Sequence, residues 1–591
     1  MIGQAVQMER TDERMSRMLF YNGTVITMEE PFCAQAVLTE EGVIRAVGTF
    51  EDVRAAAGEG EMRLVDLQGH TLMPGFIDPH SHFTACANAT MQVDLGEAEC
   101  FEDVIRLIRE FIEREQIPAG QWVRASGYDH NRLREGRHPD RTVLDQAAPE
   151  HLLMVSHQSG HMGAFNTRAL KALGVDGHTE PPQGGMIAVE DGEPTGYMEE
   201  NAFLQYIQKA PMPSPEAFLE AYRKAQKLYA SYGITTVQEG MMSAPLGPLY
   251  QLLLHSGILE LDLVAYVDME AGDELKRQFA DHIGTYKDHM KIGGYKMFLD
   301  GSPQGRTAWL REPYLPAEGA AAPAEGAAAP AEGAAAPTEG AAAPAEGAAA
   351  PAEGAAAPAK DCGYPTLTDA AVKSNILRAE RDQMQLLAHC NGDAACEQYL
   401  REYAAALAEL PDHTPGDIRP VMIHAQLLGL DQLERVKALG IIPSFFLAHV
   451  YHWGGIHLKN LGQKRAERIS PARSALEHGI RFTLHQDAPV IRPDMMETVW
   501  CAVNRLTRNG VLLGAKERIS VEDALRAVTI NGAYQYFEED KKGSIAPGKL
   551  ADFVILERNP LEADPMDLRT IRVMATIKEG KCIYRAGGIA G

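Results

Sequence analysis

The chain has 591 residues, a formal net charge of −25 and 45% hydrophobic residues, which allows a large globular core. So acidic a chain argues against nucleic acid and against an anionic membrane as partners, because both attract a basic face. No run of about 18 apolar residues predicts a transmembrane helix, and residues 1–17 lack the apolar core of a secretory signal. None of the eight cysteines forms a C-x-x-C pair, so we expect reduced thiols and a cytoplasmic protein.

Both ends of the chain carry short strand-type runs separated by turn residues. Residues 1–72 contain such a run at 43–47, and residues 541–591 contain another at 553–556. We expect the two ends to pair into one small β-sandwich domain, with the rest of the chain inserted between them.

Strand-length and helix-length segments alternate over residues 73–540, which predicts βα units and a parallel sheet. Eight segments are of strand type, and they are residues 72–82, 234–239, 261–267, 295–300, 385–389, 421–424, 441–446 and 481–487. Eight parallel strands with helices between them form a (β/α)8 TIM barrel, an α/β fold that carries its chemistry at the C-terminal ends of the strands.

Two stretches interrupt the barrel pattern. Residues 90–210 are too long for one crossover, so we expect a lid subdomain over the barrel mouth, where loops make substrate contacts. In residues 316–358 proline recurs at every seventh position, and proline in every unit forbids a continuous helix. This repeat has no large apolar residue to bury, so we expect a disordered loop of proline, alanine, glutamate and glycine.

The first barrel segment ends in His80 and His82. On an extended strand, residues two apart point the same way, so both imidazoles can bind one metal ion through neutral nitrogens. Asp78 could orient one of the rings. Taken alone, a His-x-His pattern is as typical of polar residues at a strand end as of a metal site.

Further candidate ligands lie in the later strands or at their ends, and they are Lys296, His389, His424 and Asp487. A lone histidine on an apolar strand is more often a core residue than a ligand. Five imidazole or carboxylate groups on one rim, however, fit a divalent ion that keeps a site for water. We therefore expect a metal-assisted hydrolase in which Asp487 takes the proton of that water and hands it to a leaving nitrogen.

Sequence motifs spread over nearly the whole chain resemble those of a known protein family. They are residues 74–82, 296–301, 389–394, 424–426, 487–489, 524–533 and 543–552. With them the chain resembles the amidohydrolase superfamily, in its YtcJ-like or amidohydrolase-3 branch, which includes N-substituted formamide deformylase. The resemblance implies two zinc ions bridged by an N6-carboxylated lysine, which by position is Lys296, with metal ligands His80, His82, Lys296, His389, His424 and Asp487.

Several assignments stay open at this point. Lys296 could be an ordinary lysine paired with Asp300 or with a substrate carboxylate. The ions could be Zn, Mn, Fe or Ni, since a His/carboxylate site accepts each of them. His161, in a Gly-His stretch that resembles one in the family, could bind a substrate carbonyl or be a structural loop histidine. Glu239 could add a carboxylate to the rim or serve as a salt-bridge partner.

The function we expect is hydrolysis of a non-peptide C–N bond in a small-molecule amide by metal-activated hydroxide. The alternatives are an esterase or lactonase on the same centre, an isomerase or decarboxylase, and a non-catalytic regulatory protein that keeps the fold. Related enzymes suggest a homodimer, and we expect no nucleic acid or membrane partner.

Overall fold

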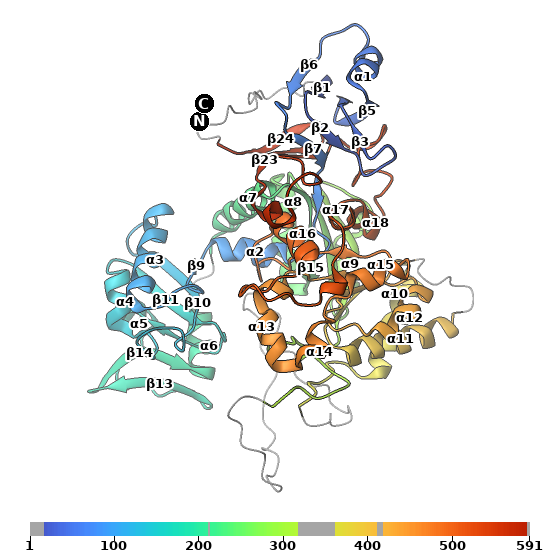
Figure 1. Ribbon diagram of the computed structural model, residues 1–591. Helices are drawn as coiled ribbons and strands as arrows, with labels where there is room; N and C mark the ends of the chain where they lie inside the picture. The colour runs from blue at the N-terminus through green and yellow to red at the C-terminus, as the bar shows by residue number, and fades with distance from the viewer. Residues whose placement is uncertain (1–16, 211–212, 317–360, 411–417, 588–591) are drawn as a thin grey trace. The chain divides into compact units, whose positions relative to one another are not determined.

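The computed structural model describes residues 17–210, 213–316, 361–410 and 418–587 (Figure 1). These residues fall into two compact units: residues 84–225 form one, and the rest of the described chain forms the other. The predicted repeat at 316–358 lies, apart from Pro316, outside the described residues. Within the described ranges, no helix is long and apolar enough to cross a membrane.

A parallel eight-stranded sheet forms the centre of the larger unit. Its strands are neighbours in chain order, and they are β8 (Phe76–Ile77), β15 (Ile234–Met242), β16 (Asp262–Asp268), β17 (Met290–Phe298), β18 (Gln385–Cys390), β19 (Val421–His424), β20 (Ile442–Phe445) and β21 (Thr483–Leu484). After β8, the N–H of His82 donates to the carbonyl of Ala488, which follows β21, at 2.8 Å. The two edges of the sheet therefore come together, and the prediction of eight parallel strands in a TIM-like barrel is confirmed.

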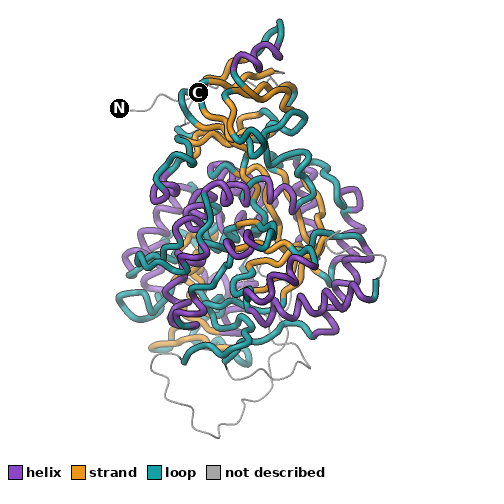
Figure 2. Tube along the Cα trace, turned by 45° about the vertical axis from the view of Figure 1, so that its right-hand side comes forward, coloured by secondary structure: helices purple, strands orange, loops and turns teal. Residues whose placement is uncertain are grey.

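Helices lie outside these strands (Figure 2, purple against orange). In the larger unit they are α8 (Gly247–Ser256), α9 (Gly272–Gln278), α10 (Asp369–Asp382), α11 (Asp393–Ala408), α12 (Leu433–Ala438), α13 (His449–Leu461), α14 (Gln463–Ala466), α15 (Ala472–Glu477), α16 (Met495–Asn504), α17 (Val521–Ala527) and α18 (Ile530–Gln535). Buried side chains from several strands meet in one hydrophobic cluster, which contains Ile77, Val264, Tyr266, Leu387, Val421, Ile423, Ile442, Ala533 and Tyr536.

Strands from the two chain ends pair directly in a six-stranded sheet. Its order is β24 (Lys581–Arg585), β23 (Val573–Lys578), β22 (Phe553–Leu556), β7 (Thr71–Pro74), β2 (Thr24–Ile26) and β3 (Cys33–Ala34). In Figure 1 the blue N-terminal strands lie beside the red C-terminal ones. A second sheet has the order β5 (Val43–Gly48), β4 (Ala36–Glu40), β1 (Arg17–Tyr21) and β6 (Arg63–Asp66), and α1 (Phe50–Ala57) follows β5. Both sheets contribute to one apolar cluster, in which the rings of Phe20 and Phe553 lie 5.5 Å apart.

The predicted first barrel segment, residues 72–82, is two strands in two different sheets. β7 ends at Pro74, and β8 contains only Phe76 and Ile77. At Gly75 between them, a Cβ would lie 2.5 Å from Thr235 Cγ2, so a larger residue would clash where the chain changes sheets. Because β8 ends at Ile77, the two candidate histidines lie in the loop after the strand. The prediction that strand alternation aligns them is therefore wrong.

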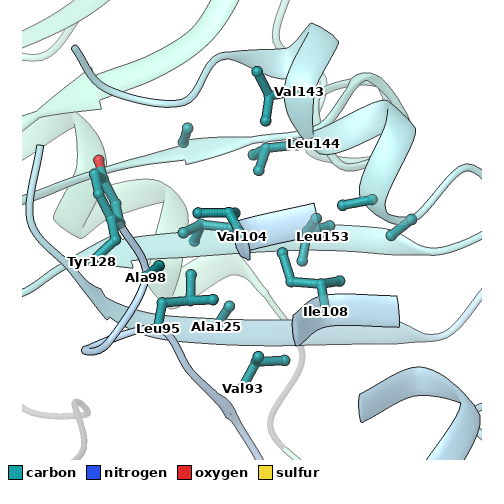
Figure 3. Packing of buried hydrophobic residues seen from close by; sticks show 14 of the residues in the cluster. Val93, Leu95, Ala98, Val104, Ile108, Ala125, Tyr128, Val143, Leu144 and Leu153 are labelled. Atoms are coloured by element: carbon teal, nitrogen blue, oxygen red, sulfur yellow. The ribbon is translucent and has the colours of Figure 1, made fainter. Parts of the chain in front are cut away.

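The unit of residues 84–225 has its own sheet and core. The sheet has the order β13 (Gly185–Glu190), β14 (Glu193–Glu199), β12 (Met162–Phe165), β11 (Leu152–His157), β10 (Trp122–Tyr128) and β9 (Val93–Asp94). Its helices are α3 (Phe101–Arg114), α4 (Arg141–Ala147), α5 (Thr167–Leu173) and α6 (Glu200–Lys209), while α2 (Phe83–Thr90) and α7 (Pro215–Ser231) contain the boundaries. Val104 and Ile108 of α3 pack with Leu95, Ala125 and Leu153 (Figure 3). This inserted unit is wider than the predicted lid of residues 90–210.

Lys578 of β23 lies among buried carboxylates. Its Nζ is 3.0 Å from Asp262 Oδ2 and 3.1 Å from Asp552 Oδ2, and its side chain is only 3% exposed. Lys578→Met should lower the free energy of unfolding by about 3–5 kcal/mol, because two buried carboxylates lose a partner. The control Lys581→Met removes a 70% exposed lysine paired with Glu260, and it should cost about 0–1 kcal/mol. Urea unfolding followed by circular dichroism compares the two, and equal effects would contradict this role of Lys578.

Candidate metal centre

Three side chains of metal-ligand type meet where the two edges of the barrel sheet come together. His80 and His82 come from the loop after β8, and Asp487 follows β21. Asp487 Oδ1 lies 3.6 Å from His80 Nε2 and 3.5 Å from His82 Nε2. Ligands bonded at about 2.0–2.2 Å to one ion are separated by distances of this size. The donor set therefore fits a divalent ion.

Lys296, His389 and His424 lie beside this group. Lys296 of β17 is 1% exposed, and its Nζ is 3.2 Å from His80 Nε2. The rings of His389 in β18 and His424 in β19 have centroids 4.7 Å apart, and the His424 centroid is 5.5 Å from that of His80. The six predicted ligands therefore gather at one rim of the barrel, although they are spread between residues 80 and 487 of the sequence.

The backbone is unusual at two of these positions. Asp487 has φ +57° and His424 has φ +69°. Residues other than glycine seldom adopt this left-handed conformation, which costs on the order of 1–3 kcal/mol and is concentrated at functional sites. The chain thus bears a conformational cost where it presents these two side chains to the rim.

Gln238 of β15 fixes the imidazole of His80. Its Oε1 lies 2.6 Å from His80 Nδ1, and its own amide donates to Pro79 O at 2.7 Å. With Nδ1–H donating to Gln238, the Nε2 lone pair is directed to the ligand group. Gln238 takes the orienting role that the sequence suggested for Asp78, whose Oδ1 accepts the backbone N–H of His80 at 3.3 Å. Burial raises the pKa of Asp78 to about 7, although Ser81 and the N–H of His80 act in the opposite direction.

Two further side chains lie next to the other imidazoles. His424 Nδ1 lies 3.1 Å from His485 Nε2, and His485 Nδ1 lies 2.9 Å from Ser444 Oγ. His389 Nδ1 is 3.3 Å from Asp300 Oδ1. A hydrogen bond like that between His424 and His485 fixes the tautomer and the ring plane of a metal ligand, whereas the approach of His389 to Asp300 lacks hydrogen-bond geometry. His485, which stands two residues before Asp487 and follows β21, is a functional residue that the sequence did not predict.

Asp300 and Glu239 are both buried carboxylates beside the centre. Asp300 accepts backbone N–H groups from Asn391 at 2.9 Å, Gly392 at 2.7 Å and Trp309 at 3.0 Å. Three such donors hold this carboxylate in place next to His389. Glu239 accepts from the hydroxyl of Tyr250 at 2.5 Å, and its Oε1 lies 3.9 Å from His82 Nδ1. Glu239 is therefore next to a ligand histidine.

Comparison with known proteins agrees with this geometry. The model of the amidohydrolase family that is called amidohydrolase 3 matches residues 63–584. The chain belongs to the amidohydrolase family. The family assignment that the sequence motifs predicted is therefore confirmed.

Two relatives span nearly the whole of this amidohydrolase. N-substituted formamide deformylase of Arthrobacter pascens is 27% identical, covering 97% of this chain and 99% of its own. The putative amidohydrolase YtcJ of Bacillus subtilis is 25% identical, covering 96% of this chain and 99% of its own. The similarity therefore includes both chain ends, the barrel and the inserted unit.

Solved structures have the same fold. An uncharacterized metal-dependent hydrolase from Pyrococcus horikoshii has a TM-score of 0.70 at 21% identity, covering 93% of this chain and 99% of its own. Its counterpart from Pyrococcus furiosus has a TM-score of 0.69 at 21% identity, covering 92% and 100%. At this level of identity the comparison supports the mixed α/β amidohydrolase fold.

His161, the predicted substrate contact, belongs to the inserted unit of this amidohydrolase. It precedes β12, and its side chain is 53% exposed. Its Nδ1 lies 3.2 Å from Glu200 Oε2. His161 is thus a solvent-accessible imidazole with an acidic partner.

His485→Leu tests the orienting contact to His424. We expect the affinity for divalent metal to fall about 10- to 100-fold, because His424 loses the group that fixes its tautomer. Ser444→Ala removes a contact one step further from the ligand and should have a smaller effect. Competition with a chelator measures both affinities, and wild-type affinity in His485→Leu would contradict the assignment.

Proposed function

We propose that this amidohydrolase hydrolyses a non-peptide C–N bond of a small-molecule amide, with two zinc ions as its cofactor. The observation that carries the proposal is the approach of Asp487 Oδ1 to His80 Nε2 at 3.6 Å and to His82 Nε2 at 3.5 Å. The choice of an amide is supported by the similarity to a relative named N-substituted formamide deformylase.

His80, His82 and Asp487 would hold one ion, and His389 and His424 would hold the other. Lys296 would stand between the two ions as an N6-carboxylated ligand. An unmodified ammonium so close to His80 Nε2, at 3.2 Å, would repel a cation bound there, whereas a carboxylated lysine offers an anionic oxygen. The donor set also accepts Mn, Fe or Ni, so metal analysis decides the identity.

Each residue of the centre would have a separate role in the hydrolysis. A divalent ion held by His80, His82 and Asp487 would lower the pKa of a water molecule to about 7 and polarise the substrate carbonyl. Asp487 takes a proton from the attacking water on Oδ2, because its Oδ1 faces the two imidazoles, and delivers it to the leaving nitrogen. One amide and one water thus give one carboxylic acid and one amine. Gln238 and His485 keep His80 and His424 in the orientation that this arrangement needs.

The proposal is tested with a panel of N-formyl and N-acyl amines, together with matched esters and lactones. Zinc-loaded protein is expected to release amine from at least one amide, and the Asp487→Asn variant should release it about 10²–10⁴-fold more slowly. Turnover of esters or lactones without any amide would favour the esterase or lactonase alternative. A folded, zinc-loaded protein that turns over no member of the panel would favour the non-catalytic alternative.

Three smaller proposals accompany this function. The two terminal sheets would form one β-sandwich domain, supported by their shared apolar cluster. His161 would bind the substrate. Its Nδ1 faces Glu200, which leaves Nε2 on the other side of the ring for a substrate group. A cytoplasmic location would suit eight cysteines that are all free thiols.

A further inference from the structure

The inserted unit contains a second group of metal-ligand type, independent of the barrel centre. Asp129 and His130 follow β10, and His157 is the last residue of β11. β10 and β11 are parallel neighbours, with Tyr128 paired to His157. Parallel neighbours end at the same edge of a sheet, so three potential ligands emerge side by side there.

The three ligand atoms form a compact triangle. His130 Nδ1 lies 3.2 Å from His157 Nε2. Asp129 Oδ1 lies 3.7 Å from His157 Nε2 and 3.9 Å from His130 Nδ1. These separations resemble those in the barrel centre, and they suit one ion bonded at about 2.0–2.2 Å to each atom. Asp129 Oδ1 also accepts from the backbone N–H of Asn131 at 2.9 Å, which holds the carboxylate in place.

The backbone directs the end of β10 to this triangle. The pairing of β10 with β11 shifts register between Ser126 and Tyr128, and Gly127 between them has φ +93°. A bulge of this kind re-aims the side chains that follow it and is over-represented next to functional sites. Here the side chains that follow are Asp129 and His130.

We propose that Asp129 Oδ1, His130 Nδ1 and His157 Nε2 form a divalent-metal site in the inserted unit, separate from the barrel centre and suited to zinc. Two imidazoles and one carboxylate are a donor set of zinc sites that keep a fourth position for water. The side chains are 16%, 29% and 7% exposed, respectively, so an ion can enter from solvent.

Ser159 accommodates both proton arrangements of His157. Its backbone N–H lies 3.1 Å and its Oγ 3.0 Å from His157 Nδ1. Without an ion, Nδ1 accepts from the N–H of Ser159, and Nε2–H donates to His130. An ion on Nε2 would require the proton on Nδ1, where Oγ would accept it and the backbone N–H of Ser159 would give up its bond to Nδ1.

A stacked pair of aromatic rings supports His130. The ring of His138 stacks on His130 with centroids 4.1 Å apart, and the hydroxyl of Tyr128 lies 3.0 Å from His138 Nδ1. His138 thus holds the ring of a proposed ligand in place.

The test measures zinc bound per chain, by plasma mass spectrometry after dialysis against a zinc buffer, in the full-length protein. The double variant His130→Gln/His157→Gln should bind one zinc fewer than wild type. The control His178→Gln, which removes an exposed histidine of the same unit, should bind as much as wild type. In a His80→Ala/His82→Ala background the loss should persist, so failure of the barrel centre and failure of this site are distinguishable.

Visible absorption of bound Co²⁺ gives a second readout, and circular dichroism checks that each variant is folded. If the double variant does not fold, Asp129→Asn replaces it, because the amide keeps the shape and removes the charge. Asp129→Asn should lower the affinity of this site at least tenfold. Unchanged zinc content and an unchanged cobalt spectrum in the folded variants would overturn the proposal and leave the triangle an internal hydrogen-bond network.

Discussion

Replacing Asp487 by asparagine should lower kcat for amide hydrolysis by about 10²–10⁴-fold. The amide keeps the size of the side chain but cannot take the proton of the attacking water, and it is a weaker metal ligand than a carboxylate. Asparagine tolerates the left-handed backbone at this position, where φ is +57°. The protein should therefore fold as before while losing activity, which separates chemistry from stability.

The matched control for this variant is Asp540→Asn. It makes the same chemical change at an exposed position in the same unit. With the best amide of the panel as substrate, Asp540→Asn should have the same initial rate as wild type. If Asp487→Asn retained wild-type kcat with its zinc content unchanged, Asp487 would be neither the base nor a necessary ligand.

Replacing Lys296 by alanine should remove at least one zinc ion per chain and lower kcat by about 10²–10⁴-fold, because metal stabilisation of charge contributes several kcal/mol. The side chain is 1% exposed and reaches His80 Nε2 at 3.2 Å, so its loss opens space within the centre. If a carboxylated lysine bridges the ions, a small carboxylate such as acetate should enter that space. Added acetate should then restore part of the activity and of the zinc.

Lys296→Arg distinguishes a carboxylated lysine that bridges the ions from an ordinary lysine that pairs with an anion. Arginine keeps the positive charge but cannot be carboxylated, so the bridged account predicts an inactive variant with less zinc. Full activity in Lys296→Arg, together with no effect of acetate on Lys296→Ala, would make Lys296 an ordinary cation that pairs with an anion. Lys287→Ala, at a 52% exposed lysine before the same strand, should match wild type throughout.

The barrel could be predicted because its strands are apolar runs of characteristic length, separated by helical segments. The location of the candidate ligands followed from one rule, since the C-terminal ends of parallel strands meet at one rim. The change of sheets at Gly75 could not be foreseen, because it depends on how closely Thr235 approaches from another strand. For the same reason, the sequence alone predicts a continuous strand through His80 and His82, where the structure has a loop.

The groups that orient the ligands carried almost no signal in the sequence. Gln238 lies inside a buried strand and contacts His80 across 158 residues of chain. Nothing in its neighbours distinguishes it from a satisfied core amide. The triangle of Asp129, His130 and His157 was equally hidden, since recognising it requires knowing that β10 and β11 are parallel neighbours.

The central claim is that ligands from opposite sides of the barrel rim hold divalent ions. The most direct test is the zinc content of His82→Ala/His424→Ala compared with wild type, by plasma mass spectrometry of folded protein loaded in the same zinc buffer. Each substitution removes one ligand of one proposed ion, so the account predicts that the double variant holds roughly two ions fewer per chain. Any ion in the inserted unit cancels in this difference. Equal zinc content in the two proteins would contradict the account.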